Sequence, residues 1–136
     1  MSHLIDTSLW IEMYKDRTGK LGLAIEAQFS SKDLVFARPI GLEILQGCST
    51  QQQYDLTREY LAAQTFIEMS PDTWVEASRI YFDLKRAGKT VRSSLDCCIA
   101  QLAIENGIDL IHNDRDFETI ATIRPLKHRR LDLSKV

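Results

Sequence analysis

The stretch from Leu110 to Phe117, LIHNDRDF, places two carboxylates, Asp114 and Asp116, directly after a short apolar run. We expect residues 109–111 to form a brief buried strand, with both acids in the loop that leads to the next helical turn. In open α/β sheets, ligands bind just outside the carboxyl ends of the strands. Oxygen ligands at such an edge suit Mg²⁺, which usually keeps several of its waters. The alternative is a solvated polar turn, since the chain contains 19 acidic residues.

Three further acids are expected at the same edge of the sheet. Asp6 ends a first β-prone run, and Glu43 lies one turn into the helix that follows a second strand. Asp96 occupies the first turn of the helix before the strand at 109–111. Clustered carboxylates repel one another, which raises pKa values and costs stability unless a cation binds. Their joint placement predicts a metal site, although each acid taken singly is also explained as a helix cap, a dipole partner or a solvated residue.

The elements that must position these acids alternate between strands and helices. Strands are expected at residues 3–5, 34–36, 66–68 and 109–111, with a fifth near Leu126 or Leu131. Helices are expected after Asp6, over about 20–29, from Pro39 to near Gly47, over 51–64, from about 71 to 88, from Ser93 or Ser94 to Gly107, and over 117–121. This alternation predicts an α/β fold with three α/β/α layers and a central, mainly parallel sheet.

Two of these helices have informative apolar patterns. The helix over 71–88 carries Trp74, Ala77, Ile80, Tyr81 and Leu84 at three- and four-residue steps, which predicts one apolar face. The helix over 51–64 has apolar residues among many polar ones, so its apolar face is narrow.

The length and composition indicate one soluble globular domain spanning residues 1–136. The chain is 44% hydrophobic and 26% charged, and no apolar run approaches the roughly 20 residues needed to span a bilayer. The first ten residues have neither a basic leader nor a long apolar region, so we expect cytoplasmic residence by default.

The cysteines and the net charge argue against disulfide-rich proteins, structural zinc proteins and strongly basic proteins. Three cysteines without a Cys-x-x-Cys pair predict buried inert thiols and no disulfide framework or structural zinc site. A formal net charge of -2 gives no strongly basic field. If the substrate is nucleic acid, attraction must come from local patches and bound metal.

Three other phosphate-handling classes lack their motifs here. A haloacid-dehalogenase-type phosphatase needs a second aspartate two places after the nucleophilic one, but Thr7 and Ser8 follow Asp6. A receiver domain is expected to have adjacent acids near the first strand and a late strand-end lysine, and neither pattern is present. A Walker-type site needs a glycine-rich loop ending in Lys and Ser or Thr, whereas the glycines are scattered.

The chain resembles the PIN-domain family, and most closely its VapC-type toxins of type II toxin–antitoxin systems. The resemblance covers nearly the whole chain and rests on LIDTSLWIE, RPIGLEILQG, SSLDCCIAQLA and LIHNDRDFETIA. It carries the acidic catalytic positions of the family onto Asp6, Glu43, Asp96 and Asp114, with Asp116 as an additional acid. Asp6, Asp96 and Asp114 correspond to metal ligands. Thr7 or Ser8 matches a small hydroxyl residue, and His112 departs from the Thr or Ser common before the last acids.

The resemblance implies an endoribonuclease that uses Mg²⁺ or Mn²⁺ to activate water for attack on an RNA phosphodiester. The alternative is a PIN-like module that binds RNA or a partner without catalysis. Ser8, Arg92 and His112 are candidate substrate contacts. Arg92 is otherwise an exposed loop arginine, while His112 is otherwise a partner of Asp114 or part of a loop. The basic run over residues 127–130 is a further RNA contact or solvated surface.

The resemblance also implies protein partners. A cognate antitoxin can lay an amphipathic segment between the helices at 40–47 and 51–64, whose apolar residues include Leu42, Leu45, Tyr54 and Tyr60. It can also place a basic side chain against the acidic pocket. A homodimer bordering a shared RNA groove is the expected assembly.

Overall fold

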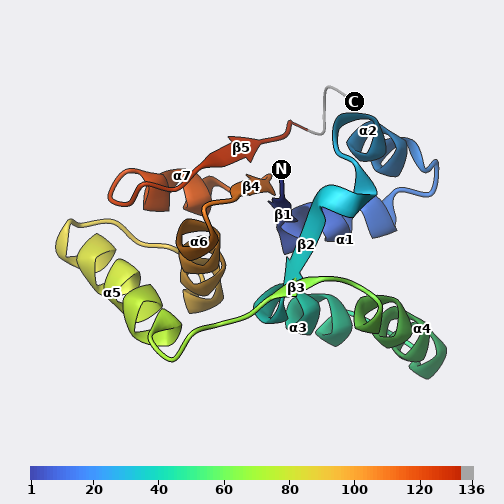
Figure 1. Ribbon diagram of the computed structural model, residues 1–136, viewed down its shortest axis with the longest axis horizontal. Coiled ribbons are helices and arrows are strands. Elements are labelled where there is room, and N and C mark those ends of the chain that lie inside the picture. The colour runs from blue at the N-terminus through green and yellow to red at the C-terminus, as the bar shows by residue number, and fades with distance from the viewer. Residues whose placement is uncertain (133–136) are drawn as a thin grey trace.

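The computed structural model describes residues 1–132, which contain a five-stranded parallel sheet of order β3-β2-β1-β4-β5 (Figure 1). The strands are β1 (His3–Ile5), β2 (Leu34–Ala37), β3 (Phe66–Ile67), β4 (Asp109–His112) and β5 (His128–Arg130). Parallel neighbours require crossover connections, which are usually helices. The predicted α/β/α architecture is confirmed.

The connecting helices end close to the predicted positions. They are α1 (Thr7–Lys15), α2 (Lys20–Gln28), α3 (Arg38–Gln46), α4 (Gln51–Ala62), α5 (Thr73–Arg86), α6 (Ser94–Asn106) and α7 (Arg115–Ala121), with a 3₁₀ turn η1 (Ser31–Asp33) before β2. Ser93 caps α6, because its hydroxyl accepts the backbone N–H of Leu95 at 3.1 Å. Gly107 ends α6 at φ 62°, a left-handed conformation that favours glycine.

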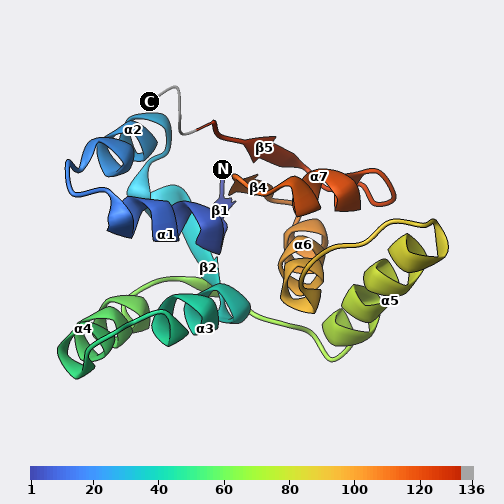
Figure 2. The same cartoon turned by 180° about the vertical axis from the view of Figure 1, so that it is seen from behind.

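The central strands bury both faces, as the two-residue period of a strand requires. Leu4 of β1 pairs with Leu110 of β4, and both join the larger hydrophobic core with residues of α3 to α7. The next pair, Ile5 and Ile111, belongs to a second core with residues of α1 and α2. Figure 2 shows the sheet from the opposite side, with α1 close to β1. The strand ends are therefore held rigidly from two sides.

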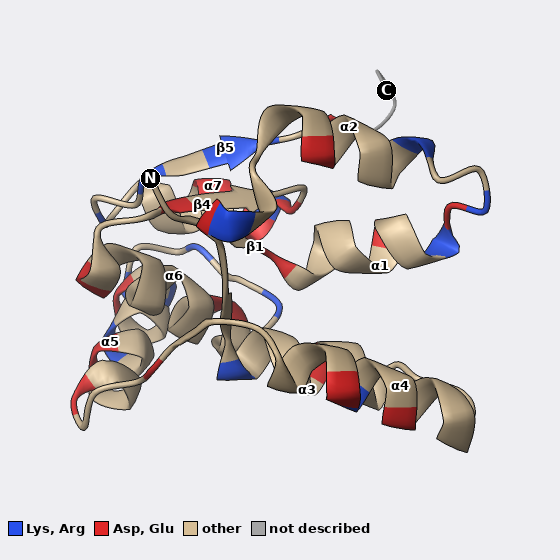
Figure 3. Cartoon of the chain, turned by 45° about the vertical axis from the view of Figure 1, so that its right-hand side comes forward, with Lys and Arg blue, Asp and Glu red and all other residues tan. Residues whose placement is uncertain are grey.

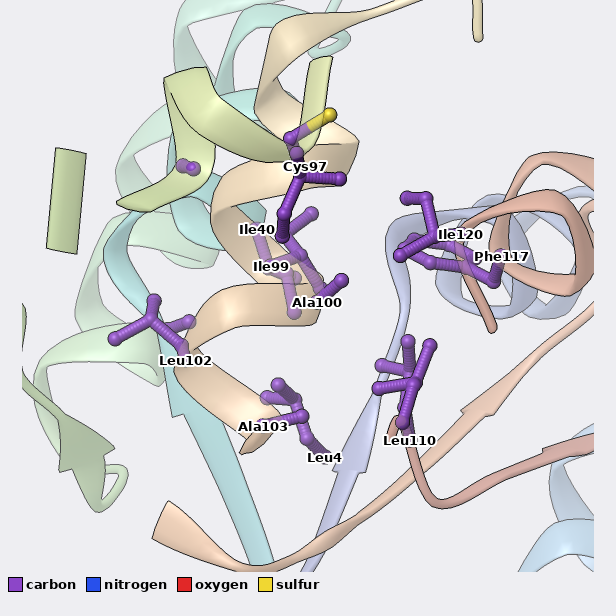
Figure 4. Packing of buried hydrophobic residues seen from close by; sticks show 14 of the residues in the cluster. Leu4, Ile40, Cys97, Ile99, Ala100, Leu102, Ala103, Leu110, Phe117 and Ile120 are labelled. Carbon is purple, nitrogen blue, oxygen red and sulfur yellow. The ribbon is translucent and has the colours of Figure 1, made fainter. Parts of the chain in front are cut away.

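Helix α6 lies deepest in the molecule. Ile99 and Leu102 are fully buried, and Figure 4 shows their helix packed beside Leu4, Leu110 and Phe117. Full burial of one such aliphatic side chain is worth about 1.5–3 kcal/mol, so this packing fixes the helix that carries Asp96.

Several details differ from the sequence predictions. The fifth strand, β5, spans His128–Arg130. It therefore lies between Leu126 and Leu131, the two residues near which it was predicted. Asp116 is in the first turn of α7 and not in a loop, because Asp114 already caps that helix. On α5, Trp74 is 64% exposed and Tyr81 40% exposed, so the buried face is narrower than the spacing predicted. The narrow apolar face of α4 is confirmed, with Leu61 its buried residue.

The cysteines follow the prediction in part. Cys97 is buried, and burial raises the pKa of its thiol to about 12, as expected for an inert core residue. Cys48 and Cys98 are only half-buried. No helix within residues 1–132 combines the length and apolar character needed to cross a membrane.

Candidate metal centre

A cavity of about 270 Å³ opens beside the carboxyl ends of β1 and β4. Its lining brings together four of the five predicted acids with neighbouring small residues: Asp6, Thr7, Ser8, Ile11, Glu43, Arg92, Ser93, Asp96 and Asp114. Four different segments of the chain contribute to this lining, and we call it the acidic pocket. Its position is the strand-end edge that the sequence predicted.

Asp6 joins β1 to α1. Its backbone N–H donates to the carbonyl of Ile111 at 2.8 Å, which extends the β1–β4 pairing to the strand end. Its carboxylate Oδ2 caps α1 by accepting the N–H of Ser8 at 3.0 Å. The other oxygen, Oδ1, is buried and has no hydrogen-bond partner among the described residues. Burial raises the pKa of Asp6, because desolvation outweighs the Ser8 hydrogen bonds. A buried carboxylate oxygen without a partner is costly, which is the condition a cation relieves.

Asp96 lies in the first turn of α6 and is buried. Desolvation, followed by the charges of Asp6, Asp114 and other acids, raises its pKa to about 7. Without a cation, this carboxyl is therefore about half protonated at neutral pH. A carboxylic acid held close to its titration point among like charges marks a functional site.

Asp114 and Asp116 form the other side of the centre, and the guanidinium group of Arg92 pairs with both carboxylates. Asp114 caps α7 by accepting the N–H of Asp116 at 2.9 Å. Arg92 donates from Nη2 to Asp114 at 2.8 Å and from Nε to Asp116 at 3.2 Å. Its own backbone N–H also donates to Asp116 at 3.0 Å. The Arg92 side chain is 78% exposed, so it covers these acids from the solvent side.

Glu43 reaches the pocket from α3. The hydroxyl of Thr7 donates to its Oε1 at 2.9 Å, which links α3 to the start of α1. Partial burial, more than the neighbouring charges, raises the pKa of Glu43. The Thr7 hydroxyl therefore positions the Glu43 carboxylate. The Ser8 hydroxyl instead accepts the backbone N–H of Asn113 at 3.2 Å and orders the β4–α7 turn.

His112 is the last residue of β4 and not part of a loop, and its side chain is fully buried. Its Nδ1 accepts the N–H of Asp114 at 3.1 Å, and its Nε2 shares a hydrogen bond of 3.0 Å with His128 Nδ1. Burial lowers the pKa of His112 to about 4, so the ring is neutral near pH 7. A direct RNA contact by this side chain does not fit its burial, and His112 instead supports the position of Asp114.

The donor set fits a divalent cation. Oxygen atoms of Asp96, Asp114 and Asp116 lie within 4.8 Å of one another, and Asp6 adds a buried oxygen that has no hydrogen-bond partner within residues 1–132. Hard cations such as Mg²⁺ and Mn²⁺ prefer carboxylate oxygens. Asp116, which the sequence placed outside the metal set, belongs to the tightest group.

Other residues lie around the centre: Ser93 was predicted as a possible start of its helix, but neither it nor Asn113 and Arg115 were predicted as site residues. Ser93 lines the acidic pocket and caps α6 three residues before Asp96, a spacing typical of helix starts. Asn113 and Arg115 line a second cavity beside the acidic pocket; they lie within the LIHNDRDF stretch, in which a role was predicted for the two aspartates and for His112 only.

Comparison with known proteins agrees with this geometry. Residues 3–123 match the family described as PIN domain. The chain is 35% identical over 130 residues to VapC ribonuclease Mb1587 of Mycobacterium bovis, covering 91% of this chain and 95% of that protein. The same values relate it to Ribonuclease VapC11 of Mycobacterium tuberculosis.

Solved structures share the fold at lower sequence identity. DNA-bound VapBC from Salmonella typhimurium matches with a TM-score of 0.75 and 14% identity, covering 96% of this chain and 98% of that one. VapBC-1 from nontypeable Haemophilus influenzae matches with a TM-score of 0.75 and 21% identity, with coverage of 96% and 98%. The extent of the family match and the identity to its relatives show that the chain belongs to the PIN-domain family and is related within it to the VapC ribonucleases.

Proposed function

We propose that this chain is a metal-dependent endoribonuclease toxin that hydrolyses RNA phosphodiester bonds and is neutralised by a cognate antitoxin. The observation that carries the proposal is the buried, unpartnered Oδ1 of Asp6 in the same pocket as Asp96, whose pKa is raised to about 7. The names of the relatives, ribonuclease VapC, support the reaction class. One domain spanning residues 1–136 carries the activity.

The metal would be Mg²⁺ or Mn²⁺, held by Asp6, Asp96, Asp114 and Asp116. Such an ion lowers the pKa of bound water, orients the phosphate and stabilises the leaving oxygen. Glu43 faces the same cavity with one oxygen engaged by Thr7, so its other oxygen is available to accept a proton from the attacking water. The acids need no serine, cysteine or histidine nucleophile beside them.

An antitoxin site is supported next to the acidic pocket. A cavity of about 230 Å³ lies between α1, α3 and α4, lined by Ile11, Tyr14, Lys15, Glu43, Ile44, Gly47, Cys48, Gln53 and Thr57. It shares Ile11 and Glu43 with the acidic pocket. An amphipathic antitoxin segment on these helices can therefore place a basic side chain against Glu43 and exclude both metal and RNA. Neighbours of the fold are solved as VapBC complexes, which supports a protein partner of this kind.

Homodimerisation is proposed from the same family resemblance. Three large apolar side chains on α5, Trp74, Val75 and Phe82, are exposed and would be covered by a second copy of the chain. Light scattering of the purified chain gives its mass in solution. A monomer at all concentrations would contradict the homodimer without affecting the nuclease assignment.

The test of the proposed function is RNA cleavage by the purified chain with Mg²⁺ or Mn²⁺, with EDTA, and with the protein encoded by the neighbouring gene. We expect cleavage that EDTA abolishes and the neighbouring protein inhibits, and growth arrest when the chain is expressed alone. Sequencing the cleaved RNA ends then identifies the RNA. Binding of RNA without metal-dependent cleavage would instead favour a non-catalytic PIN-like module.

A further inference from the structure

A second cavity, of about 310 Å³, adjoins the acidic pocket on the side of α7 and β5. Its lining contains three arginines from three separate segments, together with an amide and two acids: Arg92, Asn113, Asp114, Arg115, Asp116 and Arg130. We call it the arginine pocket. Arg92 and Asp114 line both cavities, so they form the wall between them.

We propose that the arginine pocket binds a backbone phosphate of the RNA strand next to the phosphodiester that lies in the acidic pocket. The proposal rests on the proposed nuclease function, because it assigns a further contact to the same substrate. Its ligand is a phosphate group, the chemistry that guanidinium donors in a shared concavity recognise.

Free guanidinium donors of Arg115 and Arg130 favour an anion at this position, whereas Arg92 is paired with Asp114 and Asp116 and Arg130 also pairs with Glu118. Arg115 is exposed and makes no ion pair within residues 1–132. Arg130 donates from Nε to Asn113 Oδ1 at 3.1 Å and from Nη1 to Glu118, which leaves its other guanidinium donors available. Both side chains project from elements next to the acidic pocket, and Figure 3 shows basic positions along β5.

Arg92 connects the two cavities electrostatically. In this structure its guanidinium is occupied by Asp114 and Asp116, two of the acids in the tightest oxygen cluster. A cation held by those acids would compete for the same oxygens and would free donors of Arg92 on the wall of the arginine pocket. The three arginines then face an RNA strand that leaves the acidic pocket toward α7.

Phosphate contacts make binding depend on salt, because each neutralised phosphate releases condensed counterions. For single strands the slope of log K against log salt is about -0.7 per contact. Loss of Arg115 or Arg130 is expected to weaken binding uniformly across RNA sequences, and loss of both is expected to make the slope shallower by about 0.7, because the pocket holds one phosphate.

The experiment measures binding of a fluorescein-labelled single-stranded RNA of mixed sequence by anisotropy, over a salt series in EDTA, where Arg92 stays paired with Asp114 and Asp116 and the contribution of Arg115 and Arg130 is measured alone. The variants are Arg115→Ala, Arg130→Ala and their combination. The matched control is Arg17→Ala, which removes the same charge from the α1–α2 turn on the opposite side of the molecule from α7 (Figure 1). Arg115→Lys and Arg130→Lys keep the charge and should recover most of the binding, and melting curves establish that each variant folds.

We expect weaker binding and shallower slopes for the two alanine variants, additive in the pair, and no change for Arg17→Ala. An equal loss for Arg17→Ala would show general attraction and overturn the proposal. Unchanged RNA binding combined with weaker binding of the antitoxin would assign the pocket to the protein partner and also overturn it. If EDTA-sensitive cleavage persists while the slopes stay unchanged, only the phosphate site fails, whereas absence of metal-dependent cleavage in the wild type counts against the proposed function itself.

Discussion

The two sides of the metal centre are built differently. Asp114 and Asp116 are joined to Arg92 by short ion pairs and by helix-capping hydrogen bonds. Asp6 and Asp96 have no basic partner within residues 1–132, and burial raises the pKa of both. On one side an exposed arginine pairs with two carboxylates, and on the other side two buried carboxyls have no basic partner among residues 1–132.

This difference assigns separate tasks to the two sides. The capped and ion-paired acids hold their positions before a cation arrives, because hydrogen bonds and charge fix them. Asp6 and Asp96 lack a basic partner among the described residues, so their ionised forms are unfavourable until a cation binds, and they supply much of the free energy for binding it. A site of this kind trades stability of the metal-free protein for metal affinity.

The largest expected effect comes from the buried side. Asp96→Asn or Asp6→Asn should reduce RNA cleavage below detection without unfolding the domain, because an amide cannot supply the negative oxygen that the cation needs. Cleavage assays with matched melting curves check this. Asp72→Asn is the control, since Asp72 precedes α5 and makes no side-chain capping bond. Full, EDTA-sensitive activity in both site variants would contradict the assignment.

Asp96→Asn, which is expected to abolish cleavage, should increase the free energy of unfolding of the metal-free protein in EDTA. The pKa of Asp96 is about 7 in the folded chain, against an ordinary value of 3.8. Between these values the folded state binds more protons than the unfolded state, so the free energy of unfolding falls as pH rises and levels off above pH 7. Asp96→Asn should remove this fall and stabilise the metal-free protein above pH 7 by on the order of 2 kcal/mol.

Denaturant unfolding over a pH series measures this change. If Asp96→Asn and Asp6→Asn both destabilise the protein in EDTA at every pH, the acids are structural caps or ion-pair partners. The contrast between the two sides of the site would then be lost.

A smaller effect is expected from the ion-paired side. Arg92→Ala leaves Asp114 and Asp116 without their cationic partner and should destabilise the metal-free protein by about 1 kcal/mol, since solvent screens the exposed Arg92 although both carboxylates are largely buried. Added Mg²⁺ should restore most of this loss. Arg79→Ala breaks a comparable surface pair with Asp83 on α5 and should not respond to metal. If Mg²⁺ stabilised both variants equally, Arg92 would not act as the cationic partner of the metal-binding acids.

The smallest effect concerns the support of Glu43. Thr7→Val keeps the shape of the side chain but removes the hydrogen bond to Glu43, with an expected cost of about 0.5 kcal/mol. Cleavage should fall modestly, and the fall should be absent in a Glu43→Gln background. A double-mutant cycle measures this coupling. Independent, additive losses would show that Thr7 acts elsewhere.

Much of the architecture could be predicted because the alternation of short apolar strands with helices indicates a parallel sheet. The acids that follow those strands then indicate the edge of the sheet at which the site lies. Asp6 and Asp114 follow apolar strands, and the topology brings them together as expected. The position of Asp116 was mistaken because a cap residue and a first-turn residue have the same local sequence signals. Only the capping bond, from the Asp116 N–H to Asp114, distinguishes them.

Contacts between distant segments could not be predicted in the same way. The pairing of His112 with His128 depends on the register of β4 and β5, which a short polar strand does not specify. Trp74 has helical spacing that suits a core, yet tertiary packing leaves it exposed. The arginine pocket likewise joins residues from three segments that no local pattern connects.

The most direct test of the account is the effect of Mn²⁺ on melting temperature in the wild type and in Asp96→Asn. A ligand that binds only the folded state stabilises it by mass action. We predict that saturating Mn²⁺ raises the melting temperature of the wild type clearly, while Asp96→Asn, which starts higher in EDTA, gains little. A wild type that does not respond to Mn²⁺, or a variant that responds equally, would contradict the claim that the buried acids form a metal site.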